Sequence, residues 1–151
     1  MSEKKEPVEV WRALIETWKV WKRGVEKNLE RINLGSTEYS ILRHLTECES
    51  MPMVQMANQI MVTQGWITGL IDSMEEKKLV ERRRSKDDRR VIELYITGEG
   101  RKTFEHAKAI HMKYIENCIK HMDDETISST VKLLKGLKAN VEVADFPDIE
   151  K

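Results

Sequence analysis

The hydrophobic positions of this chain follow two different periods. In the segment 91–96, Ile92, Leu94 and Ile96 face one way and the residues between them face the other, which is the pattern of a half-buried strand. A second short strand is expected at 80–84. On both sides of this pair, apolar residues recur at intervals of three and four, which is typical of amphipathic helices. The pattern therefore predicts a mainly α fold with one small β-hairpin.

Capping and breaking residues set the bounds of six expected helices. Proline suits the first turn of a helix, and a Ser, Thr or Asp side chain can accept the first free backbone N–H groups. The helices are expected at 8–32, 37–47, 52–60 and 64–78, then from Thr97 to about 121 and from Asp123 to about 141, with caps from Ser36, Thr63, Thr97 and the pair Asp123-Asp124. The helices at 52–60 and 64–78 are joined by the short turn 61–63 and followed by the hairpin. This is the order of a winged helix-turn-helix.

The first helix carries a heavy apolar seam. Its members are Trp11, Leu14, Trp18, Trp21, Val25 and Ile32, widened by Ile15 and Leu29. Such a stripe is explained by packing inside one chain or by packing against a second copy. We favour the second explanation, because a long N-terminal helix needs a partner surface. An obligate homodimer closed by helices from both ends of the chain is therefore expected.

Positive charge gathers at the expected tip of the hairpin. Between Arg82 and Arg90, six cations stand against two acids, a local balance of +4 in a chain whose formal net charge is zero. Because the whole chain is neutral, any affinity for nucleic acid must come from charge that is concentrated in one place. An arginine-rich hairpin tip suits the grooves and phosphates of DNA, since a guanidinium adds planar, multi-donor recognition to its charge.

The outward face of the second helix in the helix-turn-helix holds residues that can read DNA. Gln64 and Thr68 lie one turn apart near its N-terminal end, where both can bond to base edges or phosphates. Gly65 and Gly69 also lie one turn apart, and two helical glycines are explained by close approach of a partner or by simple tolerance. Trp66 is expected either to stack on the neighbouring helix or to press against thymine methyl groups.

Other classes of function are not expected. Residues 1–7 lack the apolar core of a signal peptide and no apolar run could span a membrane, so a cytoplasmic protein without membrane contact is expected. No phosphate-binding glycine loop, nucleophile elbow or paired-histidine motif is present, so we expect neither an enzyme nor a cofactor. His106 and His111 are five positions apart, the wrong spacing for shared metal ligation. Cys48 and Cys118 have no CxxC spacing and are expected to be buried or half-buried thiols.

Two motifs flank the second strand. Asp88-Arg89-Arg90 stands at the hairpin tip, and Ile96-Thr97-Gly98-Glu99-Gly100 leads into the next helix. Together with Leu34–Leu45, Met56-Ala57, Thr63–Met74 and Leu79–Arg82, these motifs resemble the MarR family of transcription regulators over residues 34–100. If the flanking helices count as the family's dimerisation helices, the resemblance covers nearly the whole chain.

The resemblance implies a homodimer that binds a pseudo-palindromic operator in double-stranded DNA. Such regulators are often repressors whose DNA affinity is lowered by a phenolic or aromatic-acid effector. The resemblance divides the chain into a dimerisation helix at 1–33, a winged helix-turn-helix domain at 34–100 and dimerisation helices at 101–151. It also implies that Asp88 pairs with Arg90. The residues expected at the DNA are Thr63, Gln64, Gly65, Trp66, Thr68, Arg82, Arg84, Lys86, Asp88, Arg89 and Arg90, and those expected at an effector pocket are Trp18, Trp21, Tyr39, His44 and Tyr114.

Three residues depart from the family pattern. Gly69 stands where the family commonly has Arg, Lys78 replaces the usual Gly before Leu79, and Trp66 replaces a small residue. The first helix also has no early cysteine, so peroxide sensing of the family's type is not expected. An alternative from another class stays open, namely a winged helix that serves protein interaction or binds chromatin without sequence preference and without an effector.

Overall fold

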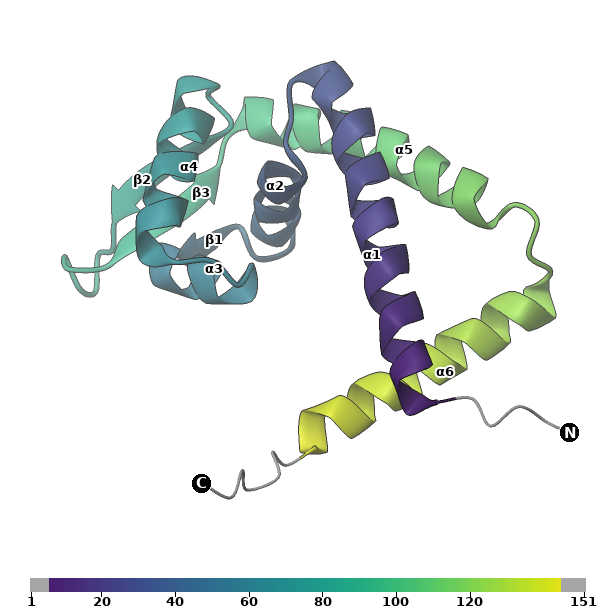
Figure 1. Ribbon diagram of the computed structural model, residues 1–151. Coiled ribbons are helices and arrows are strands. Elements are labelled where there is room, and N and C mark those ends of the chain that lie inside the picture. Colours follow the sequence, from purple (N-terminus) through teal and green to yellow (C-terminus); the bar gives the residue numbers. More distant parts are fainter. Residues whose placement is uncertain (1–5, 145–151) are drawn as a thin grey trace, which may run out of the picture. The chain divides into compact units, whose positions relative to one another are not determined.

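The computed structural model describes residues 6–144, which fall into two compact units, 6–114 and 115–144. The elements are α1 (Pro7–Leu29), the short 3₁₀ helix η1 (Glu30–Ile32), α2 (Ser36–Cys48), β1 (Ser50–Pro52), α3 (Met53–Gln59), α4 (Gln64–Glu76), β2 (Val80–Arg84), β3 (Ile92–Ile96), α5 (Gly98–Ile119) and α6 (Asp124–Val143) (Figure 1). The predicted mainly α fold with a β-hairpin is confirmed. The sequence pattern did not predict β1.

The three strands form one antiparallel sheet in the order β1-β3-β2. Leu94 in the central strand lies opposite Met51 on one side and Arg82 on the other. Strand β1 is only three residues long and ends in Pro52, which an edge strand tolerates because one side of it makes no ladder bonds. A segment of this length is too short to show alternation, which is why the pattern missed it.

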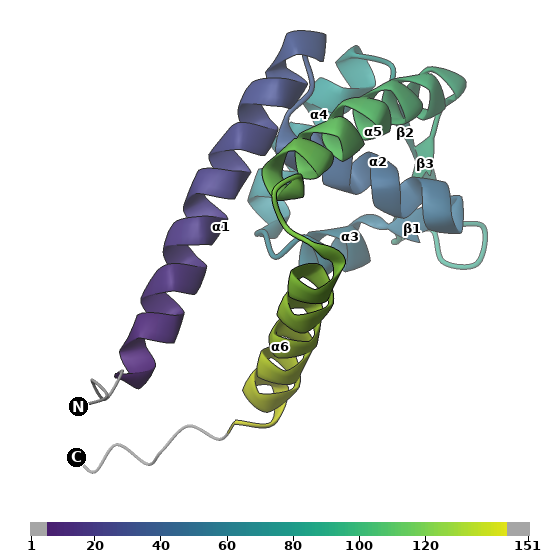
Figure 2. The same cartoon turned by 90° about the vertical axis from the view of Figure 1, so that its right-hand side faces the viewer.

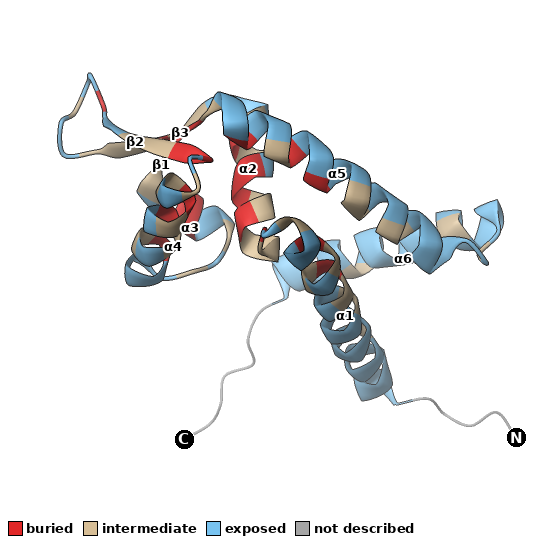
Figure 3. Ribbon diagram, turned by 90° about the horizontal axis from the view of Figure 1, so that it is seen from above, coloured by how far each residue is buried: buried red, intermediate tan, exposed pale blue. Residues whose placement is uncertain are grey.

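The core of the first unit lies between the sheet and helices α2, α4 and the start of α5. Its largest fully buried side chains are Leu29, Leu34, Ile41, Leu42, Leu45, Met56, Ile67, Ile71, Met74 and Leu94. In Figure 3 the buried positions lie on the inward sides of these helices. The predicted stripe on α4 is confirmed at Ile67, Ile71 and Met74, while Leu70 is half-buried. The stripe fixes which face of α4 is left exposed.

Three predicted helix caps are present. The Thr63 side chain accepts a hydrogen bond from the Trp66 N–H at 3.3 Å, and Thr97 Oγ1 accepts one from the Gly100 N–H at 2.9 Å. Asp123 caps α6 in the same way, with its Oδ1 2.8 Å from the Thr126 nitrogen. Each cap satisfies a backbone donor that has no partner inside its helix, so the starts of α4, α5 and α6 are fixed locally.

The predicted cap at Ser36 is wrong. Helix α2 begins at Ser36 itself with Gly35 at the cap position. Two carboxylates take the free N–H groups instead: Glu38 accepts from Gly35 at 2.8 Å, and Glu26 accepts from Ser36 at 3.0 Å. Lys77, at the end of α4, lies 2.9 Å from both oxygens of the buried Glu38. The start of α2 and the end of α4 are thereby joined by charge-assisted bonds.

Helix α4 is followed, two residues after its end, by a residue in the left-handed conformation. Lys78 has φ 58°, its N–H donates to the Glu75 carbonyl at 2.8 Å, and the Leu79 N–H donates to the Met74 carbonyl at 2.9 Å. These two bonds make a Schellman motif, in which glycine is the usual left-handed residue. Gly100 is required for a different reason, namely close packing: a Cβ atom at this position would lie only 2.1 Å from the Leu79 carbonyl oxygen. The start of α5 therefore rests directly on the turn between α4 and β2.

Much of the apolar surface of α1 and α6 is exposed in the single chain. Trp11 and Trp18 are 46% and 52% exposed, whereas Val25 and Leu29 are buried. Packing within one chain therefore accounts only for the C-terminal part of the α1 seam. Helix α6 buries no residue over its described length. None of the described helices is both long and apolar enough to cross a membrane.

Both cysteines are exposed, so the prediction of buried or half-buried thiols is wrong. Cys48 is the last residue of α2, and Cys118 lies in the last turn of α5. Helix ends extend past the core, and a helical spacing pattern alone does not show where that core stops covering them.

Candidate nucleic-acid interface

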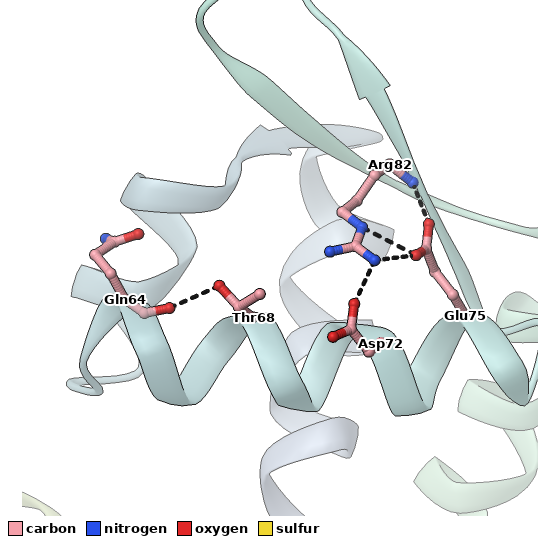
Figure 4. A network of polar contacts seen from close by, with 5 residues as sticks. All are labelled: Gln64, Thr68, Asp72, Glu75 and Arg82. Carbon is pink, nitrogen blue, oxygen red and sulfur yellow. Dashed lines mark hydrogen bonds and ion pairs between the residues drawn. The ribbon is translucent and has the colours of Figure 1, made fainter.

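The first two turns of α4 present an uncharged, solvent-facing surface. Gln64 and Gly65 are exposed, Trp66 is 49% exposed, and Thr68 is half-buried. The Thr68 hydroxyl donates to the Gln64 carbonyl at 2.8 Å, so its proton is used within the helix (Figure 4). Among the described residues, Trp66 makes no ring contact with another aromatic side chain. About half of the Trp66 surface is therefore accessible to a partner.

The two glycines of α4 have open space around them. A Cβ atom built on Gly65 or Gly69 would meet nothing within 4 Å. Packing inside the chain therefore does not require glycine at either position. Both lie where a partner could approach the helix backbone closely.

The predicted pair at the tip of the hairpin is present. The Asp88 carboxylate accepts from the Arg90 backbone N–H at 3.0 Å and from its guanidinium, with Oδ1 3.1 Å from Nε and Oδ2 3.0 Å from Nη2. Hydrogen bonds from Arg90 hold the pKa of Asp88 below its usual value. The Arg90 side chain is 90% exposed, so Asp88 fixes its direction while leaving its outer face open to solvent.

The loop between β2 and β3 is closed by its own hydrogen bonds. The Ser85 N–H donates to the Val91 carbonyl and the Val91 N–H to the Asp88 carbonyl, each at 2.9 Å. Arg84 Nη1 donates to the Arg89 carbonyl at 3.0 Å. These bonds order the backbone that carries the exposed side chains of Lys86 and Arg89. In the described part of the chain, neither of those two cations has a carboxylate partner.

The first two arginines of β2 are engaged within the protein. Arg82 Nε lies 2.9 Å from Glu75 Oε2, its backbone N–H donates to Glu75 Oε1 at 2.9 Å, and its guanidinium also pairs with Asp72 (Figure 4). Hydrogen bonds from Arg82 lower the pKa of Glu75. Arg83 pairs with Glu81 and lies over the Tyr95 ring, 4.5 Å from its centroid. The Arg82 guanidinium thus binds two carboxylates of α4 and joins β2 to that helix.

Four of the five residues expected at an effector site gather around an aromatic cluster. The rings of Trp18 and Trp21 lie tilted against each other, 5.4 Å apart between centroids, and the Tyr114 hydroxyl donates to the Trp21 carbonyl at 3.4 Å. Tyr39 stacks on Phe104 at 5.6 Å, where the first part of α5 runs across α2 (Figure 2). The fifth residue, His44, is hydrogen-bonded to Arg43 at 3.5 Å and makes no ring contact with the cluster among the described residues.

His111, whose spacing from His106 is wrong for shared metal ligation, lies at the centre of this cluster. Its ring centroid is 5.8 Å from that of Trp21 and 5.1 Å from that of Tyr39. Its Nδ1 atom is buried and has no hydrogen-bond partner among the described residues. Burial lowers the pKa of His111. Sequence alone gave no signal for this position, because the contacts join three separate helices. The described residues also contain no group of three or more His, Cys, Asp or Glu side chains arranged to hold a metal ion.

Comparison with known proteins identifies the family. A model of the MarR family matches residues 34–92. Two proteins of Bacillus subtilis (strain 168) are similar in sequence. The HTH-type transcriptional regulator MhqR is 27% identical over 118 residues, 78% of this chain and 81% of that protein. The uncharacterized HTH-type transcriptional regulator YpoP is 30% identical over 104 residues, 69% of this chain and 74% of that protein. The chain belongs to the MarR family.

The fold agrees with this membership. The crystal structure of the transcriptional regulator BldR from Sulfolobus solfataricus is 26% identical to this MarR-family chain, has a TM-score of 0.80 and aligns with 95% of this chain and 100% of that one. The chain is a transcription regulator with a winged helix-turn-helix, in which α3 and α4 are the helix-turn-helix and β2 and β3 the wing. The family match, 34–92, spans these helices and the wing tip.

Proposed function

We propose that this MarR-family regulator is a ligand-responsive repressor that binds a pseudo-palindromic operator as a homodimer. The observation that carries the proposal is the wing tip, where Asp88 holds the fully charged Arg90 outward with 90% of its side chain exposed. An exposed guanidinium of fixed direction suits a DNA groove, because little freedom remains to be lost on binding.

The two parts of the winged helix-turn-helix divide the recognition of DNA between them. Helix α4 faces the major groove, with Gln64, Gly65, Trp66 and Thr68 toward base edges and Thr63 at the positive end of the helix. The side chains of the wing that contact DNA are Arg84, Lys86, Arg89 and Arg90, with Asp88 orienting the last of these. Phosphate contacts of this kind fix position and register, whereas base contacts select sequence. Arg82 acts as a positioning residue, since its guanidinium is bonded to Asp72 and Glu75.

The exposed apolar surface of α1 and α6 supports the homodimer. Trp11 and Trp18 on α1 are about half exposed, and Leu133 and Leu134 on α6 are 74% and 49% exposed. Side chains of this size gain free energy when a second chain removes them from water. We assign dimerisation to residues 1–33 and 101–151 and DNA binding to 34–100. Two copies of α4 then lie about one DNA turn apart, roughly 34 Å, which requires a two-fold symmetric site.

The aromatic cluster supports an effector site. An aromatic acid could stack on Trp21 and Tyr39, while the unpaired Nδ1 of His111 provides a polar contact. Sites for small molecules typically combine apolar surface with a few polar groups. The cluster joins α1, α2 and α5. A ligand bound there therefore favours one arrangement of the two recognition helices of the dimer. It lowers DNA affinity only if that arrangement does not fit the operator.

Selection of bound duplexes from a random DNA pool tests this function. The proposal predicts a motif with two-fold symmetry whose half-sites are about 10 base pairs apart. The Arg89→Ala, Arg90→Ala double variant should recover far less DNA from the same pool, and Arg43→Ala, which removes an exposed arginine of α2 outside the interface, should recover as much as the wild type. Recovery of DNA without any shared motif would instead indicate a nonspecific DNA-binding module.

Salicylate is a suitable probe for the effector. In the Trp66→Phe variant the remaining tryptophans all lie on α1, so quenching reports on that helix rather than on the DNA interface. The proposal predicts that salicylate quenches this fluorescence and weakens DNA binding over the same concentration range. Quenching without any change in DNA affinity would separate the ligand from the regulatory switch.

A further inference from the structure

The helix-turn-helix of this chain contains no positive side chain. Between Arg43 and Lys77 the sequence has neither lysine nor arginine. This stretch includes β1, all of α3 and all of α4. The cations of the DNA-binding domain that face solvent are therefore concentrated on the wing, and α4 must select bases by other chemistry.

The missing cations exclude the commonest way of reading guanine. A guanine presents two acceptors in the major groove, O6 and N7, which a two-pronged donor such as Arg or Lys recognises. On the exposed part of α4 the side chains near its N-terminus are Gln64, Trp66 and Thr68. The Thr68 hydroxyl already donates to the Gln64 carbonyl at 2.8 Å, so it faces a partner as an acceptor and through its methyl group. No strong pair of donors remains for guanine.

The carboxylates of α4 are also unsuited to reading cytosine. A cytosine presents an amino group, which Asp or Glu can accept. Asp72 and Glu75 are both bonded to Arg82, and Glu76 is the last residue of the helix, far along the chain from the end that carries Gln64. The carboxylates that could accept are therefore occupied or at the opposite end of α4.

The groups that remain match an A·T pair. The Gln64 amide has one acceptor and two donor hydrogens, which suits the N6 and N7 atoms of adenine. The half-exposed Trp66 ring and the Thr68 methyl group are apolar surfaces, which suit the C5 methyl group of thymine. Gly65 and Gly69 have no atom within 4 Å of a built Cβ, so the bases beside Trp66 can come close to the helix.

We propose that α4 reads A·T pairs, with Trp66 as the residue that detects thymine methyl groups and Gln64 as the residue that detects adenine. The inference rests on the proposed DNA-binding function and adds the class of base pair that it selects. The wing positions the protein through phosphates and contributes most of the charge, while the uncharged helix supplies the discrimination.

Modified bases in the selected duplex test the inference. Uracil in place of thymine removes only the C5 methyl group, and 7-deazaguanine in place of guanine removes only the N7 acceptor. With wild-type protein, each contacted thymine that becomes uracil should lower affinity about three- to fivefold. Substitution of all half-site guanines by 7-deazaguanine should leave affinity unchanged. In Trp66→Ala the uracil effect should shrink to the part that the Thr68 methyl group accounts for, whereas in Gln64→Ala it should persist in full.

The outcomes separate the inference from the function on which it rests. A symmetric selected site whose affinity falls with 7-deazaguanine and ignores uracil would overturn the A·T assignment and leave the regulator's DNA binding intact. A uracil effect of equal size in wild type and Trp66→Ala would overturn the role of Trp66. If no motif is selected at all, the proposed sequence-specific function itself fails.

Discussion

The Arg82 guanidinium of β2 lies against the Glu75 carboxylate of α4, with Nε 2.9 Å from Oε2. Asp72, one turn earlier in α4, pairs with the same guanidinium (Figure 4). The backbone N–H of Arg82 donates to the other Glu75 oxygen, so the strand as well as the side chain is held. The wing and the recognition helix are therefore joined at the base of the wing, and their relative position is set before DNA binds.

Arg82→Ala should lower affinity for the operator while leaving the salt dependence of binding nearly unchanged. The change frees the wing from α4 but removes no phosphate contact. Binding of the variant to DNA should therefore release as many counterions as binding of the wild type. Plots of log affinity against log salt for wild type and variant measure both quantities. A slope reduced by about one per protomer would show that Arg82 contacts phosphate after all.

Unlike Arg82→Ala, the double variant Arg89→Ala, Arg90→Ala should reduce the salt dependence of DNA binding. Both side chains are exposed at the wing tip, so their loss should weaken binding and flatten the same plot by about one unit for each phosphate contact removed. The loss should be similar on operator and random duplexes, since phosphate contacts carry no sequence information. An unchanged slope would remove the wing tip from the interface.

Asp88→Ala should impair DNA binding although it removes a negative charge near the DNA. Asp88 holds the Arg90 guanidinium through Oδ1 and Oδ2, and without it the arginine side chain must be ordered by DNA alone. Simple charge counting predicts tighter binding instead. The affinities of Asp88→Ala and Asp88→Asn for one duplex decide between the two, because the amide can still accept one hydrogen bond and should lose less.

Lys78→Gly should raise the free energy of unfolding by about 0.5 to 1 kcal/mol. Lys78 has φ 58°, where a Cβ atom is unfavourable and glycine is not. The gain is reduced by the greater freedom of glycine in the unfolded chain. Lys78→Ala is the matched control, because it removes the lysine side chain but keeps Cβ, and it should give no gain in urea denaturation. Equal stability of the two variants would locate the effect in the side chain rather than the backbone.

The sequence predicted those parts of the fold that depend on local signals. The buried stripe Ile67, Ile71 and Met74 and the caps at Thr63 and Thr97 follow from spacing and residue type within a few positions. The Asp88–Arg90 pair also involves near neighbours in sequence, and the family resemblance placed it correctly.

The features that were missed depend on contacts between distant segments. Gly35 rather than Ser36 holds the cap position of α2, and part of the support for this helix start comes from a distant residue, since Glu26 of α1 accepts from the Ser36 N–H. Arg82 was predicted at the DNA, and its bonds to Asp72 and Glu75, which no local pattern reveals before α4 and β2 are placed together, support a positioning role. His111 joins Trp21 and Tyr39 from two other helices, and no local pattern marks such a centre.

His111→Phe should flatten part of the pH dependence of stability. Burial lowers the pKa of His111 in the folded chain, whereas an unfolded histidine titrates near about pH 6.5. Below that pH the unfolded chain binds more protons than the folded chain does. The free energy of unfolding of the wild type should therefore fall as pH decreases from about 6.5. Phenylalanine keeps the ring contacts without the titration.

The decisive measurement is the affinity of the purified protein for a selected symmetric duplex, compared with its affinity for a random duplex of equal length at the same salt concentration. A sequence-specific regulator is expected to prefer the selected duplex by at least about 10³-fold, with two chains bound to each duplex. Equal affinities for the two duplexes would contradict the account and leave a winged helix that binds DNA through charge alone.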